Sequence, residues 1–301
     1  MTTHVFKPDM PPPGNRIGVV AWARANLFSN WLNTLLTLFA LYLVWLIVPP
    51  LLSWTLFDAN WVGTTRADCT KSGACWVFIE QRFSQFMYGY YPSALRWRVD
   101  TTVLLAIFGA APLFISRFKH KAVYGLSFLV IYPILAYSLL HGGHWGLSTV
   151  ATSQWGGLML TLVIATVGIA GALPLGILLA LGRRSDMPAI RVVCVTFIEF
   201  WRGVPLITVL FMSSVMLPLF LPEGMNFDKL LRALIGVILF QSAYVAEVVR
   251  GGLQAIPKGQ YEASAAMGLG YWRSMGLVIL PQALKLVIPG IVNTFIALFK
   301  D

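Results

Sequence analysis

Several polar side chains that could handle a charged solute lie within strongly apolar stretches of this chain. Glu199 and Arg202 stand three residues apart, so they can share one helix face and form an ion pair. Four uncharged candidates lie further along the chain: Gln241, Tyr244, Asn293 and Thr294. Polar groups at membrane depth usually face an interior cavity or a partner. We interpret Glu199 and Arg202 as a gate or interfacial anchor rather than a substrate contact. For Gln241 and Asn293, a translocation path and hydrogen bonding between helices remain equal alternatives.

Metal-assisted, nucleophilic and nucleotide chemistry find no support in the sequence. The chain has four histidines, His4, His120, His141 and His144. His141 and His144 are three residues apart, but no cysteine or carboxylate accompanies them closely, so we expect no metal site. The sequence contains no Ser-His-Asp or metalloprotease pattern and no GxxxxGK[ST] phosphate loop. We therefore expect neither catalytic residues nor a cofactor bound by this chain.

The composition predicts that lipid is the main solvent of the chain. Of its 301 residues, 57% are hydrophobic and only 11% are charged, and the mean hydropathy is +0.74. Soluble domains have about 25% charged residues. The apolar runs are longer and less interrupted than the roughly 10-residue alternating strands of a membrane β-barrel. The sequence therefore predicts an all-α polytopic membrane protein.

Seven apolar stretches are long enough to cross a bilayer, which takes roughly 20 residues. The predicted spans are Trp31–Phe57, Val99–Ser116, Ala122–Leu140, Gly157–Gly182, Arg191–Leu221, Leu230–Val248 and Leu277–Phe299. Gly203 and Pro205 can kink or break the long fifth stretch. Pro281 marks the start of the last span or a kink in it.

The distribution of Lys and Arg predicts that the N-terminus is cytoplasmic. With that orientation, twelve Lys and Arg residues fall in inner segments and seven in outer ones, in agreement with the positive-inside rule. Residues 1–30 then form a cytoplasmic tail, and residues of about 58–98 form a periplasmic loop. The net charge of +10 is explained by these loops, so we expect no nucleic-acid partner.

The outer loop contains two cysteines six residues apart, Cys69 and Cys75. An oxidising compartment permits a disulfide between them. Two free thiols in a folded loop are the alternative, because spacing alone does not fix the geometry. Cys194 lies within a span, where we expect it to be a small core residue.

A polar, small-residue segment interrupts the apolar pattern on the predicted cytoplasmic side. Four residues loosen the chain after the sixth span: Gly251, Gly252, Pro257 and Gly259. We expect Gln260 to Met267 to form about two helical turns, with Glu262 in the first turn and Gly268 and Gly270 ending the helix. One face then carries Ala263, Ala266, Met267 and Gly270. Such a flat face can dock in a groove of another protein or pack on its own bundle.

This segment, "EASAAMGLGYWRSMGLVILP", resembles the EAA loop of ABC importer permeases. Glu262-Ala263-Ser264 occupies the first triplet, Gly268 lies at the family's spacing, and Val278 to Pro281 close the motif. "FIEFWRGVPLITVLF" (197–211) and "SAYVAEVVRGGLQAIPKGQYEA" (242–263) resemble the branch for polar and general amino acids. The resemblance covers about residues 150–301. The earlier spans and their cysteine-containing loop resemble the longer permease subunit of bacterial general L-amino-acid importers.

The resemblance implies a type I importer with a MetI-like membrane fold, a core at 149–301 and an N-terminal extension at 31–148. It implies two ATPase subunits that bind ATP and Mg²⁺, a second permease chain in a heterodimer, and a periplasmic amino-acid-binding protein. The loop at 250–276 would couple to the ATPase. The coupling residues implied are Glu262, Ala263, Ser264, Ala266, Met267, Gly268 and Gly270. The location implied is the bacterial inner membrane.

Two further hypotheses and one expectation complete the prediction. A secondary transporter driven by H⁺ or Na⁺ would use Glu199 or Glu247 as an ion site, but such carriers often have paired halves and we find no convincing internal repeat. An intramembrane enzyme would need a catalytic constellation that the sequence lacks.

Permeases of the family usually continue with one more span after the "FIALFKD" region, so we expect a C-terminal span to be missing from this sequence.

Overall fold

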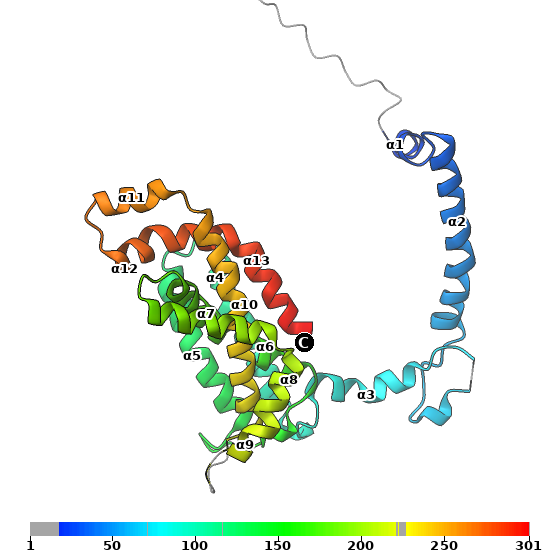
Figure 1. The fold of residues 1–301 in the computed structure, drawn as a ribbon. Helices are drawn as coiled ribbons and strands as arrows, with labels where there is room; N and C mark the ends of the chain where they lie inside the picture. Colours follow the sequence, from blue (N-terminus) through cyan, green and yellow to red (C-terminus); the bar gives the residue numbers. More distant parts are fainter. Residues whose placement is uncertain (1–17, 71, 116, 221, 223–226, 301) are drawn as a thin grey trace, which may run out of the picture. The chain divides into compact units, whose positions relative to one another are not determined.

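A computed structural model describes residues 18–300 apart from 71, 116, 221 and 223–226, and its regular elements are helices (Figure 1). Residues 1–17 of the predicted tail, including His4, lie outside the described residues. The described part divides into two compact units, up to Phe83 and from Ser84 onward. This division falls within the predicted N-terminal extension, because α4 (Trp97–Phe114) and α5 (Lys121–His141) belong to the same compact unit as the predicted core.

The first unit is built around one long apolar helix. It contains α1 (Val19–Asn26), α2 (Trp31–Leu52) with a π-helical turn at Ser53–Phe57, and a loop that leads into α3 (Trp76–Tyr88). Asn30 caps α2 by accepting a hydrogen bond from the backbone N–H of Asn33.

The second unit is a helical bundle. Its helices are α4 (Trp97–Phe114), α5 (Lys121–His141), α6 (Gly157–Arg183), α7 (Pro188–Gly203), α8 (Leu206–Phe211), α9 (Leu217–Phe220), α10 (Lys229–Ala255), α11 (Lys258–Ala266), α12 (Tyr271–Ser274) and α13 (Leu280–Lys300). Two π-helical turns, Met212–Met216 and Met275–Ile279, lie between α8 and α9 and between α12 and α13.

Six stretches of the described residues are long and apolar enough to cross a membrane: Trp31–Phe57, Ser93–Phe114, Val123–His141, Gly157–Arg183, Lys229–Ala255 and Tyr271–Lys300. The expected fifth span is broken, since Pro188–Gly203 and Leu206–Phe220 meet at 101°. The break falls at Val204 and Pro205, because Pro205 disfavours helical backbone at the residue before it. The all-α polytopic class is confirmed, with a seventh crossing only if the bent pair forms one.

The sixth span continues further than the sequence predicted. Gly251 and Gly252 lie inside α10, which continues to Ala255. Gly252 packs so closely on α13 that an added Cβ would lie 2.7 Å from the carbonyl oxygen of Ala283. This packing outweighs the low helix propensity of glycine. The helix ends where Pro257 forces an extended backbone on Ile256.

The final span also begins earlier than expected, at Tyr271 rather than Leu277. Pro281 is the second residue of α13, which begins directly after the π-helical turn Met275–Ile279. A π-helical turn changes the hydrogen-bond register. Such a change accommodates a proline, which offers no N–H to the preceding turn.

The core is centred on α6 and α10, which lie side by side in Figure 1. The buried row of α6 is made mainly of small residues: Ala165, Gly168, Ala172, Gly176 and Ala180. A Cβ added at Gly176 would lie 2.6 Å from Val245 Cγ1 and 2.9 Å from the carbonyl oxygen of Ser242. Small residues let helix backbones approach closely in a membrane. The row on α6 therefore sets the distance to α10.

We expect Gly176→Val to destabilise the bundle by about 1–3 kcal/mol, the usual cost of overpacking a core. The measurement is the midpoint temperature of unfolding in detergent micelles. Gly251→Val is the matched control, because nothing lies within 4 Å of a Cβ at Gly251. Equal shifts for the two variants would contradict the close approach of α6 and α10.

Candidate functional site

The predicted docking helix exists as α11, and it projects with α12 from one end of the core (Figure 1). Gly268 has a φ of +74°, the left-handed conformation that glycine adopts most readily. Its N–H donates to the carbonyl of Ala265, and the N–H of Leu269 donates to that of Ser264. These two bonds form a Schellman motif, so Gly268 ends α11 as the sequence predicted.

One face of α11 is attached to the bundle. Gln282 Nε2 donates to Gln260 Oε1 at 3.0 Å, and the hydroxyls of Ser264 and Ser274 are 2.6 Å apart. Ser264 is only 4% exposed. The Ser264 side chain is turned toward the bundle, and its predicted contact with a partner stays a prediction.

The opposite face of α11 is open. Glu262, Ala263, Ala266 and Met267 are exposed, and Met267 is 80% exposed. Since α11 begins at Lys258, Glu262 lies in its second turn, and the expected position in the first turn is wrong. This face has two alanines in its middle and the longer side chains of Glu262 and Met267 beside them. Docking of this face in a groove of another protein stays a prediction.

A cluster of five charged side chains joins three helices of the bundle. Glu247 on α10 is its centre and is 16% exposed. Its carboxylate lies 2.6 Å from Arg183 Nη1 on α6, 2.9 Å from Arg250 Nη2, and 3.8 Å from Arg202 Nη1 on α7. Arg183 Nη1 also lies 2.9 Å from Glu199 Oε1 on α7. The cluster holds three positive and two negative charges, so it ties α6, α7 and α10 together.

The predicted ion pair between Glu199 and Arg202 is replaced by pairs with other helices. Glu199 contacts Arg183, and Arg202 contacts Glu247. The guanidinium of Arg202 also lies over the ring of Tyr244, 5.8 Å from its centroid. The spacing along α7 suggested a pair within that helix. In the packed bundle, Arg183 instead pairs with Glu199 and Glu247, which lie 16 and 64 residues away along the chain.

The uncharged candidates have different surroundings. Gln241 is buried, and its Nε2 donates to the backbone carbonyl of Thr294 at 2.8 Å. Thr294 Oγ1 donates to the carbonyl of Gly290 within its own helix. Asn293 lies on an exposed face of α13. Gln241 therefore links α10 to α13, and the predicted polar path through these residues stays a prediction.

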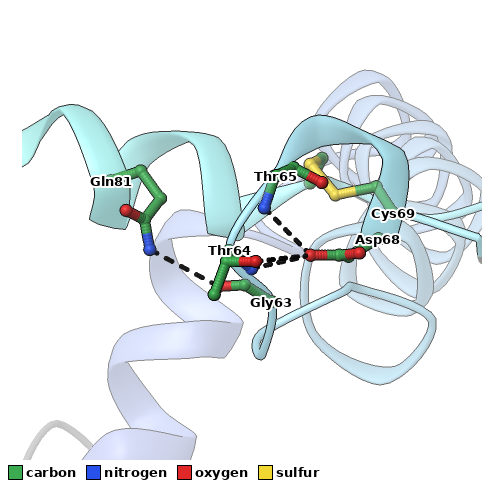
Figure 2. The surroundings of a disulfide bond; sticks show 7 residues. Gly63, Thr64, Thr65, Asp68, Cys69 and Gln81 are labelled. Carbon is green, nitrogen blue, oxygen red and sulfur yellow. Dashed lines mark hydrogen bonds between the residues drawn. A yellow bond between two sulfur atoms is a disulfide. The ribbon is translucent and has the colours of Figure 1, made fainter.

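The outer loop of the first unit is held by several local contacts (Figure 2). Cys69 and Cys75 form a disulfide. Asp68 Oδ2 accepts hydrogen bonds from the backbone N–H groups of Thr64 and Thr65, at 2.7 and 2.9 Å. These backbone bonds, first that of Thr64, lower the pKa of Asp68 below its ordinary 3.8. The rings of Trp61 and Trp76 also stack, with centroids 5.6 Å apart.

Among the described residues, no group of three or more His, Cys, Asp or Glu side chains is arranged to hold a metal ion. Cys194 is the free cysteine of the described part and is half-buried on α7.

Comparisons with known proteins give consistent matches. Residues 172–301 match the family "Binding-protein-dependent transport system inner membrane component". The chain is 64% identical over 294 residues to the inner membrane amino-acid ABC transporter permease protein YhdY of Escherichia coli K12, covering 98% of this chain and 80% of that protein. It is 40% identical over 358 residues to the glutamate/glutamine/aspartate/asparagine transport system permease protein BztC of Rhodobacter capsulatus, covering 97% of this chain and 82% of that protein.

We expect Glu247→Gln to destabilise the bundle by about 3 kcal/mol, because it leaves three neighbouring arginines without their shared counter-charge. Glu199→Gln should cost at most about 1 kcal/mol, since Glu199 has one partner and is 55% exposed. Unfolding midpoints in detergent check both values. Comparable losses for the two variants would show that Glu247 is not the centre of the cluster.

We expect Asp68→Asn to expose the disulfide of the outer loop. A carboxylate with a lowered pKa stabilises the fold above pH 3.8, and the contribution is lost as the pH falls through the lowered pKa. The phosphine TCEP should therefore reduce Cys69–Cys75 faster in the variant at pH 7, and the difference should vanish in strong acid.

Gln81→Ala is the control for this measurement, because its 3.4 Å bond to the carbonyl of Gly63 involves no ionisable group (Figure 2). A rate difference between wild type and Asp68→Asn that stays constant with pH would refute the role of the Asp68 charge.

Proposed function

Because the chain belongs to the amino-acid permease family of ABC transporters, we propose that it is the permease subunit of an ATP-driven importer for polar or general L-amino acids. The observation that carries the proposal is the division of α11 into an anchored face and an open, small-residue face. The family membership supplies the partner class for that open face, namely an ATPase subunit.

Coupling in this proposal depends on the open face of α11. Glu262, Ala263, Ala266 and Met267 contact the ATPase, whereas Ser264, Gly268 and Gly270 shape the loop. Met267 is suited to such a contact, because methionine is flexible and adapts to irregular grooves. The chain itself hydrolyses nothing, and ATP and Mg²⁺ bind to the partner.

The cargo path in this proposal uses polar groups of α10 and α13. An amino acid is a zwitterion, so its path must offer partners for a carboxylate and an ammonium group. Tyr244 and Asn293 are the candidates for contact with the cargo, and Gln241 holds the two helices in register. The charged cluster around Glu247 would act as a gate, because it joins three helices through contacts that can exchange partners.

The proposal also specifies the surroundings of the chain. Its partners are two ATPase subunits, a second permease chain and a periplasmic amino-acid-binding protein. Its location is the bacterial inner membrane, with the N-terminus and α11 in the cytoplasm. The positive-inside count supports this orientation.

The test is purification of the tagged full-length chain from its native membrane, followed by ATPase and uptake assays in proteoliposomes with a mixture of radiolabelled L-amino acids. We expect Ala266→Trp to abolish most co-purification of the ATPase, because the bulky ring stands on the open face of α11. Ala151→Trp is the matched control, since Ala151 is also exposed but lies on the predicted periplasmic side.

An ATPase that co-purifies equally with both variants would refute docking through α11. Uptake by the chain alone, driven by an H⁺ or Na⁺ gradient without ATP, would refute the importer and support a secondary transporter.

A further inference from the structure

The C-terminal end of α10 contains a backbone carbonyl whose usual donor is absent. In an α-helix, the carbonyl of Leu253 accepts from the N–H of residue 257. Residue 257 is a proline, which has no N–H. Leu253 is almost completely buried, and an unpaired buried carbonyl costs free energy. Other donors must therefore reach this atom.

Two side chains from other helices supply those donors. Arg184, at the C-terminal end of α6, donates from Nη1 to the carbonyl of Leu253 at 2.9 Å. Tyr261, on α11, donates from its hydroxyl to the same carbonyl at 3.1 Å. One carbonyl thus joins the ends of α6, α10 and α11.

The two donors also contact each other. Arg184 Nη1 donates to the hydroxyl oxygen of Tyr261 at 3.0 Å, and the guanidinium lies over the Tyr261 ring, 5.5 Å from its centroid. The Tyr261 hydroxyl therefore accepts from Arg184 and donates to Leu253. A guanidinium that both donates and stacks in this way is not replaced by a lysine ammonium.

The other side-chain hydrogen bonds between α11 and the bundle connect it to the final span. Ser264 bonds Ser274 on α12, and Gln260 bonds Gln282 on α13. Both of these elements belong to the final span. Among the side-chain hydrogen bonds of the described residues, the bond between Arg184 and Tyr261 is the one that connects α11 with the end of α6.

We propose that Arg184 and Tyr261 are positioning residues that transmit movement of α11 to α6, and so to the α6–α10 pair at the centre of the bundle. The inference rests on the proposed function, because it takes α11 as the element that the ATPase moves. Without this contact, a displaced α11 pulls on α10 and the final span only. The ATPase would then close with less effect on the bundle, and ATP would be hydrolysed without transport.

The experiment measures the ratio of ATP hydrolysed to amino acid imported, with the complete complex in proteoliposomes and a mixture of radiolabelled L-amino acids. Tyr261→Phe removes the hydroxyl and keeps the ring, and Arg184→Lys keeps the charge and removes the planar fork. We expect each variant to raise this ratio by about two- to ten-fold, the factor that corresponds to the free energy of a single hydrogen bond. The double variant should raise the ratio by less than the product of the two single effects, because the two side chains share the Tyr261–Arg184 contact.

Gln260→Ala is the matched control, since it removes a hydrogen bond between α11 and α13 and leaves α6 untouched. An equal rise in the ratio for this control would overturn the inference, because it would show that any anchor of α11 suffices. An unchanged ratio in both Tyr261→Phe and Arg184→Lys, with the ATPase still bound, would overturn it while leaving the proposed function intact.

Failure of the ATPase to co-purify with the wild-type chain would instead refute the proposed function. The two variants lie on different helices, so poor folding of one leaves the other to decide. The amount of each variant in the membrane is measured alongside, because a loss of protein lowers ATP hydrolysis and import together and leaves their ratio unchanged.

Discussion

The close approach of α6 and α10 is the constraint on which the other features of the bundle depend. It exists because α6 presents small side chains such as Ala172, Gly176 and Ala180 to α10. In lipid, where burying apolar surface adds little, such contact between backbones is a principal source of helix association. The approach has a chemical consequence at the ends of the same helices. It brings Arg183 to Glu247 and Arg184 to the carbonyl of Leu253. Both the charged cluster and the attachment of α11 therefore follow from residues that have almost no side chain.

The charged cluster and the Leu253 carbonyl show two ways of satisfying polar groups away from water. Glu247 is surrounded by arginines of α6, α7 and its own helix, so its charge is compensated whichever of them is displaced. The carbonyl of Leu253 has lost its helical donor to Pro257 and is served by two side chains instead. When one polar group has several hydrogen-bond or ion-pair partners, these partners hold the helices in one arrangement, and one partner can still replace another. The proposed import function requires a bundle that changes between states, and a single ideal partner would favour only one of them.

The sequence predicted the features that depend on local chemistry and on length. The apolar runs located the spans, Gly268 marked the end of α11 because glycine adopts a positive φ readily, and Pro205 marked the break in the fifth span. Features that depend on packing could not be predicted. Glu199 has its partner on α6, and nothing in the spacing along α7 indicates it. The inward direction of Ser264 depends on the rotation of α11 against the bundle. Pro257, four residues after Leu253, indicated that the Leu253 carbonyl lacks its helical donor, but the sequence does not show that Tyr261 and Arg184 supply the replacement.

The segments that connect α11 to α10 and to the final span differ in composition: one contains a proline and the other contains two glycines. On one side, Pro257 follows α10 with a fixed φ, and the Leu253 carbonyl accepts a hydrogen bond from Tyr261, eight residues further along the chain. On the other side, Gly268 and Gly270 precede the final span, and nothing lies within 4 Å of a Cβ at either position. Glycines surrounded by open space bend at little cost. A force applied to the open face of α11 therefore reaches the final span through Ser264 and Gln260, and it reaches α10 and α6 through Tyr261 and Arg184. Because the small-residue row packs α6 closely against α10, we expect these two helices to move together.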